Sequence, residues 1–209
     1  MEQMTKTTNS TPKISERAQA QRERILSAAQ ICFVDRGFHA ASMAAIAETA
    51  GMSQGLIYRY FAGKDEIILA IIARELTDSR NDIASLQTGN QLAARIEELF
   101  SNWLAAREDT MNARLFLELT SEASRAPKIL EAVKNSDLQA REDLGELFRR
   151  ASQEHGRQLS EGELCWRAFS LQVFVEGLVV RALREPEVDP QLLTQSLQAF
   201  LPIWLGRSG

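Results

Sequence analysis

Apolar residues recur every three or four positions along most of the chain, which is the spacing of one face of an α-helix. No stretch of useful length alternates apolar and polar residues as a half-buried strand does. The pattern therefore predicts an all-α fold. The helices that it predicts cover residues 15–36, 42–50, 53–61, 64–86, 92–104, 111–124, 127–154, 161–183 and 190–201.

Two of the predicted helices are short and are separated by a turn that contains a glycine. Ser42 and Ser53 stand where a hydroxyl can cap each helix, and Gly51 lies in the turn between them. A tight corner between helices often needs a positive φ angle, which glycine adopts without steric cost. This layout is typical of a helix-turn-helix, whose second helix enters the major groove of DNA.

The second of these helices carries side chains suited to DNA contact. Ile57 and Phe61 are four residues apart and can share a buried face, which leaves Gln54, Tyr58 and Arg59 largely on other faces. Glutamine can pair with adenine, and tyrosine and arginine can reach phosphates. A surface helix with half-buried tyrosines is the alternative.

The charge distribution supports a nucleic-acid partner for one end of the chain. The formal charge of the 209 residues is −4. Residues 1–64, however, hold eight basic and five acidic side chains, so the acidic excess lies in the remainder. No run of 18 uncharged apolar residues occurs, which argues against a membrane span. We expect a cytoplasmic protein in which Cys32 and Cys165 are reduced thiols.

Residues 164–183 are apolar on nearly every side, which is more than one core requires. We expect this helix to pack on its own domain and on a second subunit, with the last helix folded back against it. Two such hairpins would form a four-helix interface of a homodimer. The residues predicted to lie in this interface are Phe174, Gly177, Leu178, Arg181, Leu193, Leu197 and Phe200.

No pattern in the sequence indicates catalysis. A glycine-rich phosphate loop and a cysteine pair at metal-ligand spacing are both absent from the sequence. His39 and His155 fall in different predicted domains, which argues against a histidine-based metal site or triad. We therefore expect neither an enzyme nor a bound cofactor or metal.

The segment 24–64 resembles the DNA-binding domain of the TetR family of bacterial transcriptional regulators. The residues that match are Arg24-Ile25-Leu26, Ala28-Ala29, Phe33, Gly37-Phe38, Ser42, Ile46-Ala47, Ala50-Gly51-Met52-Ser53, Gly55, Ile57-Tyr58, Tyr60-Phe61 and Lys64. The chain departs from the family pattern at 43–45, where Met-Ala-Ala replaces polar or basic residues. Side-chain contacts from the first helix of the pair should therefore be few.

Residues 1–13 are polar, and their composition predicts a disordered arm. The resemblance implies two domains and a set of DNA contacts: 14–64 would be the helix-turn-helix domain, and 65–209 a helical effector-binding and dimerisation domain. Carried over by position, the residues expected at the DNA are Ser42, Ser53, Gln54, Gly55, Leu56, Tyr58, Arg59, Tyr60 and Lys64.

The resemblance also implies a cavity for a small-molecule effector in the larger domain. Aromatic residues that could line it are Trp103, Phe116, Phe148, Trp166 and Phe169. Aromatic residues at helical spacing are also ordinary core, so that alternative stays open for each of them.

These observations predict a homodimeric repressor that binds a palindromic operator in double-stranded DNA. A small apolar or amphipathic effector would release it. The alternative is a helical protein-interaction adaptor that does not bind DNA.

Overall fold

The computed structural model describes residues 12–106 and 112–206, and each element in these ranges is an α-helix, as the sequence predicts. The elements are α1 Pro12–Ala40, α2 Met43–Thr49, α3 Gln54–Tyr58, α4 Lys64–Ser85, α5 Gly89–Leu104, α6 Ala113–Ala123, α7 Pro127–Gln153, α8 Glu161–Arg184 and α9 Pro190–Trp204. The chain divides into two compact units, Met1–Ile67 and Ile68–Gly209. Most of the predicted arm, residues 1–11, lies outside the described ranges, and α1 already begins at Pro12.

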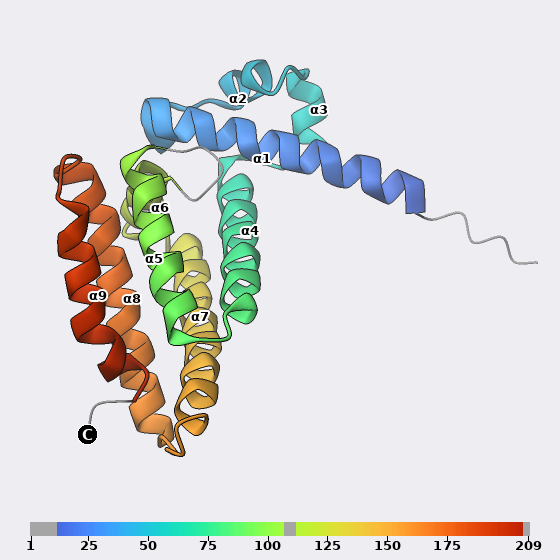
Figure 1. Cartoon of the computed structure of the whole chain (residues 1–209). Coiled ribbons are helices and arrows are strands. Elements are labelled where there is room, and N and C mark those ends of the chain that lie inside the picture. Colours follow the sequence, from blue (N-terminus) through green and yellow to red (C-terminus); the bar gives the residue numbers. More distant parts are fainter. Residues whose placement is uncertain (1–11, 107–111, 207–209) are drawn as a thin grey trace, which may run out of the picture. The chain divides into compact units, whose positions relative to one another are not determined.

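The first unit is built on α1, which packs against α2, and α2 in turn packs against α3 (Figure 1). Its core consists of apolar side chains from α1, α2, α3 and the start of α4 that are almost fully buried, including Ile25, Ala29, Phe33, Ile46, Ile57, Phe61 and Ile67. The backbone of α1 leaves helical geometry at Gly37, where φ is 75°. The sequence predicts the end of the first helix at this residue.

The turn between α2 and α3 has the predicted construction. Ser42 Oγ accepts a hydrogen bond from the Ala45 amide at 3.1 Å, and Ser53 Oγ accepts one from the Leu56 amide at 3.3 Å. Gly51 has a φ of 59°, in the left-handed region that favours glycine. Both caps and the glycine hold the two short helices at a fixed angle.

The predicted end of the second short helix at Phe61 is wrong, because α3 ends at Tyr58. The amides of Arg59 and Tyr60 bond to carbonyls three residues back, which tightens the backbone after α3. Phe61 is buried, and the Ala62 amide donates to the Glu66 carboxylate at 2.6 Å. These contacts turn the chain into α4. The 111–124 helix also starts later than predicted: Asn112 caps α6, and Met111 lies outside the described residues.

Replacing Gly51 with alanine should destabilise the first unit by about 1–2 kcal/mol, because an L-residue at this positive φ is strained. The added methyl would also lie 2.7 Å from Arg24 Nη2, although that side chain can move. Gly55→Ala, on α3 with open space around the site, is the matched control and should be neutral or slightly stabilising. Amide hydrogen exchange of the first unit measures both. Equal stability of the two variants would contradict the turn assignment.

The second unit is a bundle in which α8 contacts α5, α6, α7 and α9. Its core is formed by apolar residues that all five helices contribute, among them Leu92, Phe100, Leu147, Phe148, Leu164, Leu171, Val179, Leu197 and Trp204. The long helices lie side by side (Figure 1). None of the described helices is long and apolar enough to cross a membrane.

Candidate nucleic-acid interface and ligand cavity

Helix α3 exposes polar side chains to solvent, and one buried apolar residue anchors it to the core of the first unit. Ile57 is fully buried, whereas Gln54, Gly55 and Arg59 are exposed. Tyr58 has 50% of its surface exposed, which is far more than a core tyrosine retains. A short helix held through its inner face therefore offers glutamine, tyrosine and arginine to the solvent.

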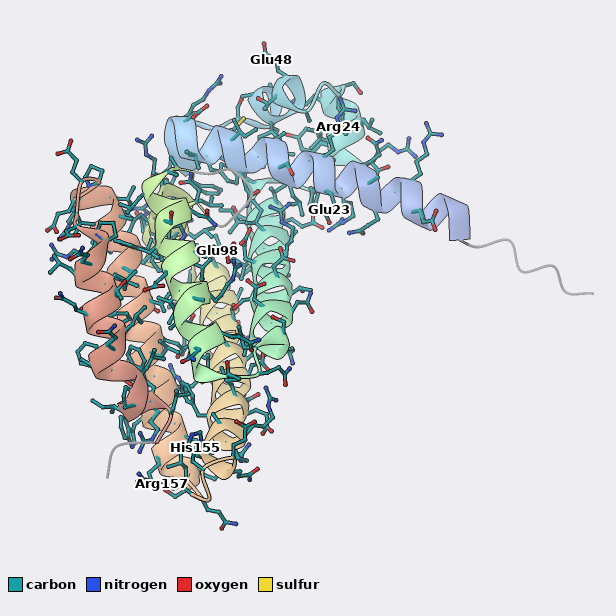
Figure 2. The ribbon with its side chains drawn as sticks, in the orientation of Figure 1. Glu23, Arg24, Glu48, Glu98, His155 and Arg157 are labelled. Carbon is teal, nitrogen blue, oxygen red and sulfur yellow. The ribbon has the colours of Figure 1, made fainter. Side chains whose placement is uncertain are left out.

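Two arginines of α1 support the backbone around α3. Arg22 Nη1 donates to the Tyr60 carbonyl at 3.1 Å, and its guanidinium lies 4.3 Å from the centroid of the Phe61 ring. Arg24 Nη2 donates to the Gly51 carbonyl at 3.4 Å, and Figure 2 labels this side chain on α1. Both guanidinium groups bind backbone carbonyls of the helix-turn-helix segment. Through these bonds, the two arginines of α1 help to hold α3 in position.

Lys64 binds backbone carbonyl groups at the C-terminal end of α1. Its ammonium donates to the carbonyls of Phe38 at 2.7 Å and His39 at 3.2 Å, and it lies 4.6 Å from the centroid of the Phe38 ring. An ammonium has three N–H donors, so these two bonds do not prevent a contact with phosphate. For the remaining residues predicted at the DNA, the contact with DNA stays a prediction. Ser42 and Ser53 are exposed caps, and Leu56 and Tyr60 are half-buried.

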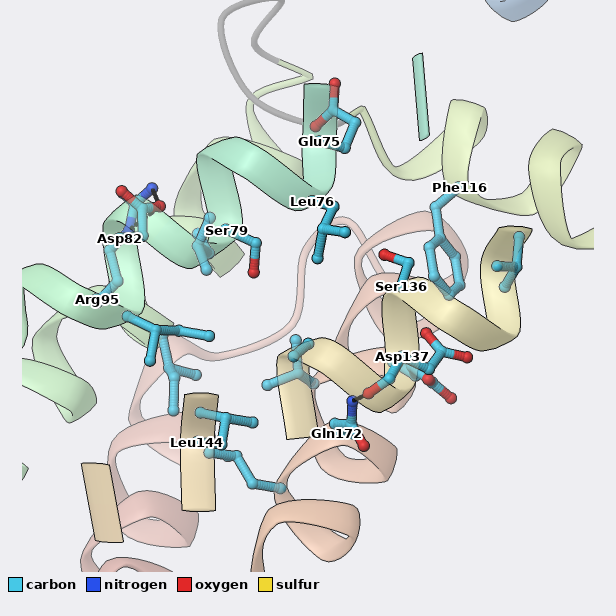
Figure 3. Close-up of a pocket in the computed structure, with 18 of the residues that line it drawn as sticks. Glu75, Leu76, Ser79, Asp82, Arg95, Phe116, Ser136, Asp137, Leu144 and Gln172 are labelled. Carbon is cyan, nitrogen blue, oxygen red and sulfur yellow. Dashed lines mark hydrogen bonds and ion pairs between the residues drawn. The ribbon is translucent and has the colours of Figure 1, made fainter. Parts of the chain in front are cut away.

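The second unit contains a cavity of about 310 Å³ among helices α4 to α8 (Figure 3). Its walls are largely apolar, and the residues that form them include Ile72, Leu76, Ile83, Leu92, Ile96, Leu99, Phe116, Leu119, Val133, Leu144, Leu171 and Val175. Concave apolar cavities of this size with a few polar groups are typical of small-molecule sites.

The polar groups of the cavity come from five helices, α4 to α8. On one side, Arg95 Nε donates to Asp82 Oδ2 at 3.1 Å, and Arg95 Nη1 donates to Glu98 at 2.8 Å. On the other side, Gln172 Nε2 donates to the Asp137 backbone carbonyl at 2.8 Å. Figure 3 shows both pairs, on either side of the cavity.

Two lining carboxyl groups have raised pKa values. Burial raises the pKa of Asp137, and the nearby Arg141 guanidinium partly opposes this rise. Glu176 is exposed, but partial desolvation is the main cause of its raised pKa, and the negative charge of Asp137 adds to it. Ionised carboxylates at these positions therefore cost free energy in the folded chain.

Asp137→Asn should stabilise the protein at neutral pH, with a rise in Tm of about 2 °C. The folded-state pKa of Asp137 lies above its unfolded value, so ionisation destabilises the fold above that folded pKa. The cost is absent below the unfolded pKa of about 4. Thermal unfolding of both chains across this range measures the effect. A variant that is less stable than the parent chain at neutral pH would contradict the assignment.

The structure separates the aromatic residues predicted to line an effector pocket. Phe116 lines the cavity, Trp103 and Phe148 belong to the hydrophobic core, and Trp166 and Phe169 are exposed on α8. The polar lining residues Ser136, Asp137, Gln172 and Glu176 were not predicted. Glu176 did give a signal, since it is one of the few charges in an otherwise apolar helix.

The outer side of α8 carries an exposed apolar stripe. We define the α8 stripe as Trp166, Phe169, Val173 and Gly177, which recur at helical spacing. Phe200 of α9 is exposed, and its ring makes an edge-to-face contact with that of Phe174 on α8, with centroids 5.8 Å apart.

The residues predicted at the dimer interface divide into two groups. Gly177, Arg181 and Phe200 are exposed, and Phe174 and Leu178 are half-buried beside them. Leu193 and Leu197 are buried within the core of their own subunit. A Cβ at Gly177 would meet no atom within 4 Å, so another helix has room to approach there.

Groups of three or more metal-ligating side chains are absent among the described residues. His155 Nδ1 lies 3.0 Å from the Ala151 carbonyl, which is a contact within its own helix turn.

Comparison with known proteins identifies the family. The family description "Bacterial regulatory proteins, tetR family" matches residues 25–71, and "BetI-type transcriptional repressor, C-terminal" matches residues 92–204. The HTH-type transcriptional regulator UidR of Escherichia coli K12 is 30% identical over 137 residues, which cover 65% of this chain and 68% of that protein.

Two solved structures share the fold. Salmonella enterica GusR superposes with a TM-score of 0.75 at 22% identity, over 95% of this chain and all of that one. SmeT, solved as a triclosan complex, superposes with a TM-score of 0.70 at 21% identity, over 88% of this chain and 90% of that one. The helix-turn-helix geometry and these matches together show that the chain belongs to the TetR family of bacterial transcriptional regulators, which act by binding DNA.

Proposed function

We propose that the protein is a homodimeric repressor that binds a palindromic operator and leaves it when a small apolar or amphipathic effector occupies the cavity. The observation that carries this proposal is α3, which is anchored by Ile57 and exposes Gln54, Tyr58 and Arg59. In this reading Gln54, Gly55 and Tyr58 face bases, while Arg59 and Tyr60 reach phosphates. Because its target is DNA, the protein would act in the bacterial cytoplasm.

Dimerisation supplies the symmetry of the operator. The α8 stripe and Phe200 form an apolar surface that a second copy would cover by a two-fold axis. Two α3 helices would then enter major grooves about one helical turn, or 34–36 Å, apart. About eight phosphate contacts per dimer would give a slope of log K against log salt near −7.

The effector would act through α4. This helix is continuous from Lys64, in the first unit, to Ser85, and Ile72, Leu76 and Ser79 line the cavity. A ligand in the cavity would therefore contact the helix to which the DNA-binding unit is joined. A coupling of about 1–3 kcal/mol between the two sites is sufficient, and DNA must weaken effector binding by the same factor. The triclosan complex of SmeT supports a ligand site in this fold.

Selection of bound duplexes from a random pool tests the function. The full chain should enrich a consensus with two-fold symmetry, and the affinity for that duplex should follow the predicted salt slope. Enrichment of no sequence above the starting pool would contradict the proposal. A consensus without symmetry would contradict the dimeric part of it.

A further inference from the structure

The cavity is lined by more acidic than basic side chains. The lining side chains include four carboxylates, Glu75, Asp82, Asp137 and Glu176, but Arg95 is the one cationic side chain among them. Arg95 is itself paired with Asp82 and with Glu98. Asp82 is thus balanced by Arg95, and Glu75 lies 3.8 Å from Arg74 Nη2, so the excess of negative charge at the cavity comes from Asp137 and Glu176.

Asp137 and Glu176 face this cavity without a paired donor. Within residues 12–106 and 112–206, neither carboxylate forms a hydrogen bond or an ion pair. Arg141 influences both through its charge, but its Nε donates to Gln172 Oε1 at 2.9 Å and its guanidinium lies 5.1 Å from the Phe169 ring. Arg141 is therefore in contact with two other residues of α8, and it acts on the two carboxylates through its charge alone.

Asp137 is half-buried and Glu176 is exposed, and both carboxylates are partly desolvated beside the cavity. Both groups have raised pKa values, chiefly because desolvation disfavours their charged forms. A positive charge placed between α7 and α8 would relieve this cost, because a nearby opposite charge favours the ionised carboxylate. The walls around them are apolar, and Phe116 contributes an aromatic ring of the kind that favours organic cations.

We propose that the cavity takes an organic cation, with its apolar body against the walls of α4 to α6 and its positive group against Asp137 and Glu176. The inference rests on the proposed function, because it gives the chemical class of the effector. Anionic amphiphiles are disfavoured, since their charge would meet an excess of carboxylates with no available cationic partner among the lining residues.

Three compounds with alkyl chains of about the same length provide the test: octyltrimethylammonium, 1-octanol and octanoate. Isothermal titration of the full chain at neutral pH should give a dissociation constant for the cation that is at least about tenfold lower than for the alcohol. Octanoate should bind most weakly. Equal affinity for the cation and the alcohol, or tighter binding of octanoate, would overturn the proposal.

The double variant Asp137→Asn, Glu176→Gln isolates the two carboxylates. It should lose most of the preference for the cation over the alcohol, with the alcohol affinity unchanged. Glu142→Gln removes one exposed charge from α7 outside the cavity and is the matched control. Because amides replace carboxylates whose ionisation is disfavoured beside the cavity, we expect the double variant to fold, and its binding of 1-octanol measures whether the cavity is intact. A preserved preference for the cation in the double variant would refute the assigned residues.

The pH dependence gives an independent readout. The titratable and charged groups around the cavity are Glu75 and Asp82 on α4, Arg95 on α5, Asp137 and Arg141 on α7, and Glu176 on α8. Octyltrimethylammonium does not titrate, so its affinity should fall as the pH drops from neutrality toward the ordinary carboxyl range near 4. The double variant should show a much flatter profile. Parallel profiles for the two proteins would contradict the inference.

Release of the selected duplex separates this inference from the proposed function. If a neutral or anionic apolar compound releases DNA and the cation does not bind, the cation inference fails while the regulatory function stands. If the cation binds with the predicted preference and leaves DNA binding unchanged, the cavity assignment stands and its regulatory role fails.

Discussion

Replacing Tyr58 with alanine should reduce the affinity for the selected operator by about 100-fold or more. Tyr58 is half-exposed on α3, and a dimer loses the side chain from both half-sites at once. A good base or backbone contact is worth about 1–3 kcal/mol, so two lost contacts account for a reduction of this size. Fluorescence anisotropy with the selected duplex measures the loss, and sedimentation shows whether the dimer persists.

Tyr58→Phe is the matched variant, because it keeps the ring and removes only the hydroxyl group. A hydroxyl contact with phosphate predicts a loss in this variant too, whereas a ring contact with a thymine methyl predicts little change. Either result keeps α3 as the reading helix. Undiminished operator binding by the alanine variant would remove α3 from that role.

Val173→Glu should raise the dissociation constant of the dimer by at least about 100-fold. Val173 lies in the middle of the α8 stripe with 50% of its surface exposed, so the substitution does not disturb the core of its own subunit. Two-fold symmetry would place two new carboxylates in an apolar interface, and burying each without a partner costs several kcal/mol. Sedimentation velocity over a concentration series measures the shift.

Leu130→Glu is the control for dimerisation. Leu130 is 45% exposed on α7, outside the α8 stripe, so the same change in chemistry should leave the dimer intact. Dimers that persist in Val173→Glu, or that dissociate equally in both variants, would show that the α8 stripe is not the interface.

Local signals predicted the helices well because they depend on neighbouring residues. Ser160 caps α8 with the reciprocal contact from Glu163, and Asp189 caps α9 ahead of Pro190. Gly51 has the positive φ that its place in the turn required. Each of these features acts within four residues, which is the range that a sequence pattern describes directly.

The end of α3 and the cavity depend on contacts between distant residues. The sequence predicts helix to Phe61, but burial of that ring among core residues and the Glu66 contact turn the chain earlier. Asp137 belongs to a helix whose polar residues appear simply solvated in sequence. It lines a cavity only because α7 and α8 pack with space between them and α4.

Trp166 and Phe169 show a further limit of periodicity. Their apolar character is evident in the sequence, yet spacing does not say which side of an apolar helix faces its own core. Arg167, between them in sequence, is buried in its own subunit, so the two aromatic residues are turned outward. The helix has two apolar faces, and the fold assigns one of them to the subunit core.

Methylation interference on the selected duplex tests most directly whether two α3 helices occupy the major groove. The account predicts interference from guanine N7 methylation, which modifies the major groove, in two symmetric patches about one helical turn apart. Tyr58→Ala should weaken both patches alike. Interference confined to minor-groove adenine N3, or to a single patch without a symmetric counterpart, would contradict the account.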